Sequence, residues 1–141
     1  MKKDDCIFCK IANGEIPSHT LYEDDIFRVI LDLGPATKGH ALIIPKNHYD
    51  NLWELGDAEA AGVIPLAKKI AAAMLEELHC DGLNLIQNNN QIAGQTIFHF
   101  HTHIVPRYKN DGNKFSFVTH EADENLLKEI AEKINSRLQV R

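Results

Sequence analysis

Hydrophobic residues recur along this chain at two spacings, which predict both strands and helices. Short runs rich in β-branched and aromatic residues, each bounded by turn-forming residues, predict five strands at residues 20–22, 26–31, 40–45, 83–87 and 98–106. The acidic residues 23–25 would close the first two strands into a hairpin, and a further short strand is expected at residues 115–118.

Apolar positions three and four residues apart predict three helices. A short helix lies within residues 1–14 and is closed by Gly14. The last helix spans about residues 121–138, and its acidic first turn and basic last turn complement the helix dipole. Its apolar stripe consists of Leu127, Ile130, Ile134 and Leu138.

The longest helix is expected from Asp57 to His79, with Asp57 as its N-cap. Pro65 falls early in this span, so we expect either a bend there or a later start. Its apolar stripe consists of Val63, Ala67, Ile70, Met74 and Leu78. The remaining surface is rich in alanine, which either packs on a second copy of the chain or simply faces solvent.

This order of elements predicts an α+β fold, with a mostly antiparallel five-stranded sheet, one long helix and a C-terminal helix. The 141 residues, of which 44% are hydrophobic and 25% charged, fit a single soluble domain with a buried core.

The formal net charge of -5 argues against nucleic acid or an anionic membrane as a partner, because either would require clustered lysine and arginine. An anionic substrate must therefore be met by local groups. No apolar run approaches the roughly 18 residues of a membrane span, and the first residues lack the apolar region of a signal peptide. A cytoplasmic location is the default expectation.

The three cysteines argue against a disulfide framework, because their number is odd and no export signal is visible. Cys80 is expected to be a reduced residue at a helix end. Cys6 and Cys9 form a Cys-x-x-Cys pair, which suits either a metal or thiol chemistry without one. A structural zinc would need two more donors, for which His48 and His99 are the candidates.

Three histidines recur at every second position of the last predicted strand. His99, His101 and His103 would share one face, roughly 7 Å apart in succession, while Phe98, Phe100 and Ile104 would face the other way. Their imidazoles can bind an anionic group, attack it and protonate a leaving group. A catalytic metal held by the same three rings is the direct competitor, and a histidine-rich strand face without function is the remaining alternative.

Two neighbouring segments complete the candidate site. His40 opens the third predicted strand, where it could meet the His101 face. The amide-rich stretch at residues 88–96 is too long for a tight hairpin turn. It is either an idle polar connection or a source of hydrogen-bond donors for a ligand.

The stretch from His99 to Val105, with the pattern His-φ-His-φ-His-φ-φ in which φ is mostly apolar, resembles the signature of the histidine-triad (HIT) superfamily. Thr102 is its one polar departure. Further stretches are similar to the Hint-like branch in order and spacing, at residues 7–11, 15–17, 22–24, 32, 39–48 and 88–96. The resemblance covers about residues 5–107, the expected core of a single domain 1–141, and leaves about 108–141 as a C-terminal extension.

The resemblance implies an α+β fold, homodimers that pair through a helix and an edge strand, and action on nucleotides at the α-phosphorus. His101 would be the nucleophile that forms a covalent nucleotidyl-histidine intermediate. His103 and His40 would bind the phosphate and assist the leaving group, and the backbone carbonyl of His99 would orient His101 by accepting its other ring proton.

The same resemblance implies a nucleotide pocket. Asp32 would accept hydrogen bonds from the ribose hydroxyls, and Phe8, Ile11 and Leu33 would line the base pocket. Residues that would contact the phosphate or the leaving group are Asn88, Gly94, Gln95 and Thr96. The simpler interpretations are that Phe8 and Leu33 are core residues and that Asp32 caps a turn.

The resemblance also bears on the metal. Family members with an N-terminal Cys-x-x-Cys often bind zinc with that pair and two histidines, which matches Cys6, Cys9, His48 and His99. Others lack the cysteines, so the zinc would be structural and no catalytic metal is expected. The leading hypothesis is a hydrolase of purine-nucleotide conjugates such as AMP-N phosphoramidates. The alternatives are a dinucleoside polyphosphate hydrolase, a nucleotide-binding interaction module with little turnover, and a metal-dependent hydrolase.

Overall fold

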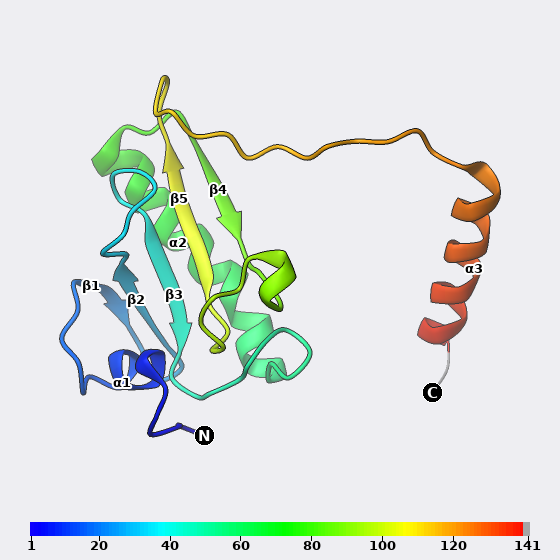
Figure 1. Ribbon diagram of the computed structural model, residues 1–141. Coiled ribbons are helices and arrows are strands. Elements are labelled where there is room, and N and C mark those ends of the chain that lie inside the picture. Colours follow the sequence, from blue (N-terminus) through cyan, green and yellow to red (C-terminus); the bar gives the residue numbers. More distant parts are fainter. Residues whose placement is uncertain (140–141) are drawn as a thin grey trace.

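A five-stranded antiparallel sheet forms the body of the computed structural model, which describes residues 1–139 (Figure 1). Its strands stand in the order β1-β2-β3-β5-β4, and every neighbouring pair is antiparallel. Their bounds are Thr20–Glu23 for β1, Phe27–Leu31 for β2, Ala41–Pro45 for β3, Gly82–Ile86 for β4 and Thr102–Arg107 for β5. The predicted α+β fold with an antiparallel five-stranded sheet is confirmed.

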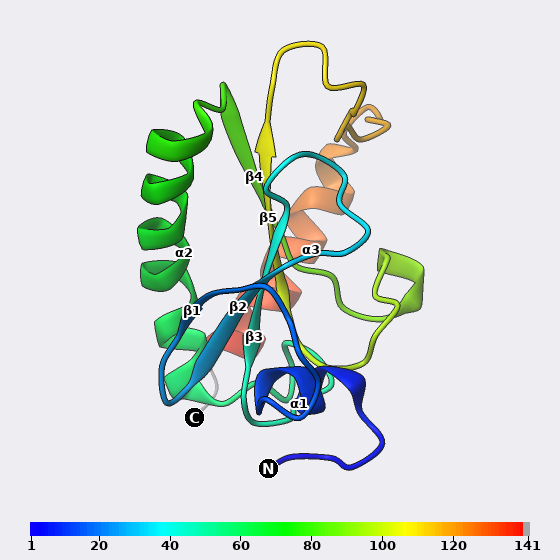
Figure 2. The same cartoon turned by 90° about the vertical axis from the view of Figure 1, so that its left-hand side faces the viewer.

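The two faces of the sheet carry different helices (Figure 2). Val29 and Ile43 of the central strands pack against α2 (Asp57–Leu78), together with Ile104 of β5. Ile30 and Leu42 point to the opposite face and pack against α1 (Ile7–Ala12). Because both faces are covered, β2 and β3 are apolar almost throughout rather than alternating with polar residues.

The N-terminal helix ends where the sequence predicted. The N–H of Gly14 donates to the carbonyl of Ile11 at 3.1 Å, and Gly14 adopts a φ of +81°, which glycine tolerates at no steric cost. Cys6 is the N-cap, and its Sγ accepts a hydrogen bond from the N–H of Cys9 at 3.4 Å. The cap therefore places both cysteines on the first turn of α1.

The start of α2 differs from the prediction. Gly56, not Asp57, is the N-cap, and Pro65 lies inside the helix, so the expected later start is wrong. A Cβ at position 56 would come within 2.5 Å of Glu59 Oε1 and 2.7 Å of Tyr49 Oη, and the Tyr49 hydroxyl donates to the other oxygen of that carboxylate, Oε2, at 3.1 Å. Within residues 1–139, no helix combines the length and hydrophobicity needed to cross a bilayer.

The predicted histidine strand is shorter than expected. The ladder of β5 begins at Thr102, and residues 97–101 are irregular. The N–H of Phe100 donates to the carbonyl of Tyr49 at 2.7 Å, so this backbone is bonded to the loop after β3 instead of to a neighbouring strand. The expectation of three evenly spaced imidazoles on one regular strand is therefore wrong, whereas Ile104 faces away from them as predicted.

Beyond β5 the C-terminal part of the chain runs away from the body (Figure 1), with the Phe115 ring still beneath Arg107, whose Cζ lies 4.9 Å from the ring centroid. The strand expected at residues 115–118 is wrong, because this segment is extended without strand pairing. The helix α3 (Glu124–Gln139) begins later than predicted, since Asp123 Oδ1 caps it by accepting the N–H groups of Asn125 and Leu126.

Residues 114–139, named here the C-terminal arm, place α3 apart from the sheet on the β4 side (Figure 1). Every described residue of α3 is exposed, and Phe117 and Val118 are 94% and 86% exposed. The apolar stripe predicted for this helix therefore has no place in the core of its own chain.

Candidate functional site

A cavity of about 550 Å³ lies on the α1 face of the sheet, and His101 and His103 both form part of its wall. Their ring centroids are 5.0 Å apart. The floor is apolar, since Phe8 of α1 and Leu42 of β3 line it. The arrangement places two imidazoles in the wall of a partly open and largely apolar cavity, as is typical of a small-molecule site.

His101 is held in one orientation. Its Nδ1 donates to the carbonyl of His99 at 2.7 Å, which leaves Nε2 unprotonated in the neutral ring. The ring is 8% exposed and meets the Phe8 ring edge-on, with centroids 4.9 Å apart. Burial lowers the pKa of His101, so the neutral, nucleophilic form prevails near pH 7. The carbonyl contact implied by the resemblance is present.

His103 and His40 form a hydrogen-bonded pair. His40 Nε2 lies 2.9 Å from His103 Nδ1, and His40 Nδ1 accepts the backbone N–H of Ala36 at 3.0 Å. Burial, together with the neighbouring rings of His101 and His40, lowers the pKa of His103 to about 4. Burial also lowers the pKa of His40. The predicted meeting of His40 with the histidine strand therefore takes place at His103.

Asp32 serves the turn and the cavity together. Its Oδ1 accepts the N–H of Gly34 at 2.8 Å, as an Asx-turn residue does, and its side chain lines the cavity. Its Oδ2 lies 3.6 Å from His40 Nε2. The Asp32, His40 and His103 ligand atoms lie within 4.8 Å of one another, close enough to hold a metal, although the two imidazoles are already bonded to each other.

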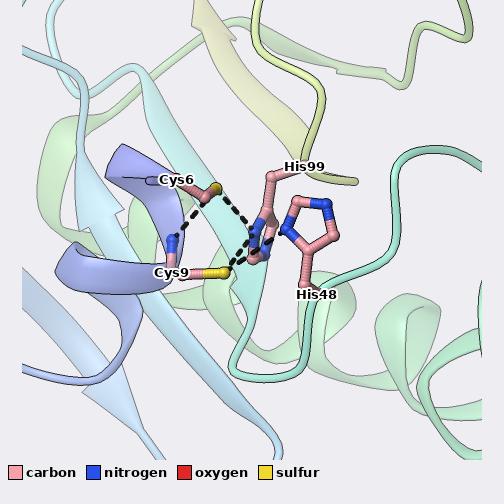
Figure 3. A group of neighbouring side chains, drawn as sticks. All are labelled: Cys6, Cys9, His48 and His99. Carbon is pink, nitrogen blue, oxygen red and sulfur yellow. Dashed lines mark hydrogen bonds between the residues drawn. The ribbon is translucent and has the colours of Figure 1, made fainter. Parts of the chain in front are cut away.

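A second cluster lies where α1 meets the ends of β3 and the 97–101 segment (Figure 3). It brings together the side chains of Cys6, Cys9, His48 and His99. The Sγ atoms of both cysteines lie 3.4 Å from His99 Nδ1, and Cys9 Sγ lies 3.3 Å from His48 Nδ1. The four predicted metal ligands, far apart in sequence, thus converge on one point.

The cluster fits a tetrahedral zinc. With Zn–S bonds of about 2.3 Å and Zn–N bonds of about 2.0 Å, sulfur and nitrogen ligands lie about 3.5 Å apart, close to the distances found. His99 Nε2 donates to the carbonyl of Pro45 at 2.8 Å, and His48 Nε2 lies 2.7 Å from Asp50 Oδ1. Both bonds leave Nδ1 to face the sulfurs, as second-shell partners of metal-bound histidines do. Burial also lowers the pKa of His99 to about 4, which favours the neutral, ligating ring.

The predicted nucleotide residues divide into two groups. The side chains that line the cavity are Phe8, Ile11, Asp32, Leu33 and Thr96. Asn88, Gly94 and Gln95 do not belong to the cavity wall defined by the described residues. The amide-rich stretch therefore reaches the cavity only at its end.

The Gln95 side chain is buried and makes hydrogen bonds within the protein. Its side chain is 1% exposed, its Oε1 accepts the N–H of Asn90 at 2.8 Å, and its Nε2 donates to the carbonyl of Asp50 at 2.6 Å. These bonds fix the 88–96 loop to the segment after β3. The ligand contact that the resemblance implies for Gln95 stays a prediction, and these side-chain bonds within the protein do not test it. Asn88 packs against Gly94, where a Cβ would lie 3.3 Å from Asn88 Nδ2.

Sequence reasoning missed one wall of the cavity. It is formed by residues 16–19, between α1 and β1, where Ser18 and His19 add polar groups. Nothing in the apolar spacing of this stretch marks it, because it belongs to no helix or strand. Asp50, which orients His48, was also missed, although an acidic residue two positions after a candidate ligand is a usable signal.

Comparison with known proteins agrees with this geometry. The sequence model of the HIT domain matches residues 13–110. The chain belongs to the HIT family. An adenosine 5'-monophosphoramidase from Schizosaccharomyces pombe is 37% identical over 134 residues, which span 94% of this chain and 98% of that protein. An adenylylsulfatase from Arabidopsis thaliana is 45% identical over 109 residues, or 77% of this chain and 55% of that protein.

Solved structures of HIT proteins share the fold. A crystal structure from Streptococcus mutans has 44% identity and a TM-score of 0.92, and the match covers 98% of this chain and 88% of that one. A zinc-bound histidine triad family protein from Mycobacterium smegmatis has 39% identity and a TM-score of 0.72, with 94% and 97% covered. Zinc is thus found in at least one structurally similar relative.

The low pKa of His103 predicts how stability depends on pH. Between its ordinary value of 6.5 and about 4, the unfolded ring binds a proton that the folded ring does not. The contribution of neutral His103 to the free energy of unfolding is therefore complete above pH 6.5. It falls by about 3 kcal/mol as the pH is lowered to about 4. We expect His103→Gln to reduce by that amount the pH dependence of the free energy of unfolding, measured with urea between pH 7 and 4. The exposed His120→Gln is the control, and equal slopes in both variants would contradict the prediction.

Proposed function

We propose that the protein hydrolyses purine-nucleotide conjugates at the α-phosphorus, with AMP-N phosphoramidates as the leading substrates. The observation that carries the proposal is His101, a buried neutral imidazole with its Nδ1 proton bonded to a carbonyl and its ring in the wall of the cavity. The relatives are named as an adenosine 5'-monophosphoramidase and as an adenylylsulfatase, and the adenylyl group common to both names supports the α-phosphorus as the target.

The proposed reaction has two steps. His101 Nε2 bonds to phosphorus as the bond from phosphorus to the amine nitrogen breaks, and the amine leaves as a neutral molecule after taking a proton from solvent. Water then attacks the nucleotidyl-histidine, which releases the nucleotide, restores neutral His101 and returns a proton to solvent. Asp32 would bind the ribose hydroxyls beside the apolar base pocket of Phe8, Ile11 and Leu33, all of which line the cavity.

The geometry also bears on the competing metal-dependent mechanism. That mechanism would need the rings of His99, His101 and His103 to converge on one ion. The ring of His99 instead points to the two cysteines, and His101 uses Nδ1 for a carbonyl. The proposed chemistry is therefore nucleophilic catalysis by an imidazole, with the metal confined to the cysteine cluster.

The first test is the variant His101→Ala. We expect it to lower turnover of an aminoalkyl adenylate at least 1,000-fold, because it removes the imidazole whose unprotonated Nε2 forms the covalent intermediate. His79→Asn is the matched control, since His79 is the C-cap of α2 in the left-handed conformation that asparagine tolerates. A nucleotidyl adduct on the wild-type protein should be visible by mass spectrometry after rapid acid quenching.

Other outcomes would select the alternatives. Full activity in His101→Ala would reject the mechanism. Faster hydrolysis of dinucleoside polyphosphates than of phosphoramidates would favour that substrate class. Tight AMP binding with negligible turnover on the whole panel would indicate a nucleotide-binding module.

We further propose that Cys6, Cys9, His48 and His99 hold a structural zinc. The cluster joins α1 to the sheet, and its ligand distances fit the ion. When bound, the zinc would link the helix that lines the cavity with the segment that carries His101.

The zinc proposal predicts a metal content near one atom per chain. We expect Cys9→Ser to lower that content sharply and to reduce the melting temperature, because the bound metal stabilises the folded state. Cys80→Ser is the control, since Cys80 is buried but lies outside the cluster. Elemental analysis and thermal melts of both variants make the measurement, and equal zinc content in both would contradict the assignment.

We propose that the chain forms a homodimer in which the C-terminal arm of each subunit packs on the other. The arm carries apolar side chains that its own body leaves exposed, and it extends past β4, one of the two edge strands of the sheet. The Streptococcus mutans crystal structure matches 98% of this chain, so its match includes the arm. A second copy is the simplest molecule that could hold the arm in a shared position.

The dimer predicts a mass of twice 15.9 kDa in sedimentation equilibrium. We expect Ile130→Asp to weaken the dimer at least tenfold, because it places a charge on the apolar stripe of α3. Glu129→Gln lies in the neighbouring ion pair with Lys133 and serves as the control. A monomeric wild-type protein, or an unchanged dimer in Ile130→Asp, would exclude the arm from the interface.

A further inference from the structure

The hydrogen bonds around His40 occupy both of its ring nitrogens. Nδ1 faces the N–H of Ala36 at 3.0 Å, and Nε2 faces His103 Nδ1 at 2.9 Å. A backbone N–H can only donate, so His40 Nδ1 must be the unprotonated nitrogen. The single proton of the neutral ring is therefore on Nε2, from which it is donated to His103.

The direction of this hydrogen bond determines the tautomer of His103. Because His103 Nδ1 accepts, the neutral His103 ring carries its own proton on Nε2. His103 lines the cavity, whereas His40 is not part of the wall that the described residues form. The chain of bonds thus runs from a backbone N–H, through His40, to an N–H donor at the cavity.

We propose that His40 is a positioning residue that acts only through His103, and that the backbone N–H of Ala36 sets the direction of the pair so that His103 Nε2–H faces the substrate. The inference rests on the proposed function for the identity of the substrate oxygen or nitrogen that receives this hydrogen bond. It differs from the direct phosphate contact that the family resemblance suggests for His40.

The loop that supplies the Ala36 N–H is fixed at several points. The N–H of His40 donates to the carbonyl of Thr37, and the buried Thr37 hydroxyl donates to the carbonyl of Pro106 in β5. Asn113 Nδ2 donates to the carbonyl of Ala36 itself at 3.0 Å. The peptide group that follows Ala36 and the next residue, Thr37, are therefore held, which limits the movement of the Ala36 N–H.

The position of the Asp32 carboxylate favours the same direction of the hydrogen bond between His40 and His103. Its carboxylate lies 3.6 Å from His40 Nε2, the nitrogen to which the pair assigns a proton. A negative charge beside an N–H is favourable, whereas beside a lone pair it would be repulsive. The carboxylate and the Ala36 N–H thus favour the same tautomer from opposite ends of the ring.

The tautomers can be read directly by long-range ¹H–¹⁵N correlation NMR of the zinc-loaded full-length protein. We expect His40 and His103 to be protonated on Nε2, while His101 is protonated on Nδ1 and serves as an internal reference of the opposite kind. A His103 ring protonated on Nδ1 would overturn the proposal. This measurement does not depend on turnover, so it remains decisive if no nucleotide conjugate is a substrate.

Two substitutions of His40 separate positioning from direct contact. Glutamine can place an amide N–H near the position of His40 Nε2 but cannot carry an imidazole charge, and phenylalanine can do neither. We expect His40→Phe to lower kcat about tenfold to a hundredfold, as loss of one oriented donor does. We expect KM to change less than threefold, and His40→Gln to recover kcat to within about threefold of wild type. Equal loss in both variants would show that His40 contacts the substrate itself.

The backbone donor is tested by Ala36→Pro, which removes the N–H, against Ala36→Gly, which keeps it. We expect only the proline variant to show His40 protonated on Nδ1 and His103 in mixed tautomers. Wild-type tautomers in a folded Ala36→Pro protein would show that the Ala36 N–H does not set the direction. Should that variant not fold, the wild-type spectrum and the His40 pair still decide the proposal.

Discussion

The hydrogen bond from His101 Nδ1 to the carbonyl of His99 is the constraint on which the rest of the site depends. A carbonyl orients a ring only if the carbonyl is itself immobile. The His99 side chain is fully buried, with Nε2 bonded to Pro45 and Nδ1 facing the two cysteines, so this residue has no freedom to turn. His99 therefore links the two groups: its side chain belongs to the cysteine cluster, and its carbonyl orients the His101 ring.

The two faces of the sheet differ: one carries the apolar core and the other carries the cavity and the cysteine cluster. On one face α2 covers Val29, Ile43 and Ile104 in an ordinary apolar core. On the other face the short helix α1 contributes both Cys9 to the cluster and Phe8 to the cavity, where its ring touches both His99 and His101. A helix of six residues is too short to be stable by itself, so its attachment through the cysteines has direct consequences for the shape of the cavity.

Hydrophobic spacing was sufficient to predict the five strands of the sheet and the long helix, because these depend on side chains that the sequence states. Hydrophobic spacing failed where hydrogen bonds to backbone groups determine the local structure. The histidine strand was predicted too long because period two assumes a continuing ladder, whereas Phe100 bonds to the carbonyl of Tyr49. The bonds that the Gln95 side chain makes to Asn90 and Asp50 could not be predicted either, because the sequence shows an amide but not which backbone groups lie beside it.

Three of the histidines that meet here, His40, His99 and His101, are chemically identical in the sequence, and their backbone partners make them different. The carbonyl of Pro45 leaves His99 Nδ1 facing the cysteines, and the carbonyl of His99 leaves His101 Nε2 unprotonated. The N–H of Ala36 has the opposite effect on His40: it occupies the lone pair of Nδ1, so the ring proton is on Nε2 and is donated to His103. Any residue type can supply a carbonyl, and all but proline an N–H, so these assignments leave no mark on the sequence. The fold selects the chemistry by deciding which peptide group faces which ring.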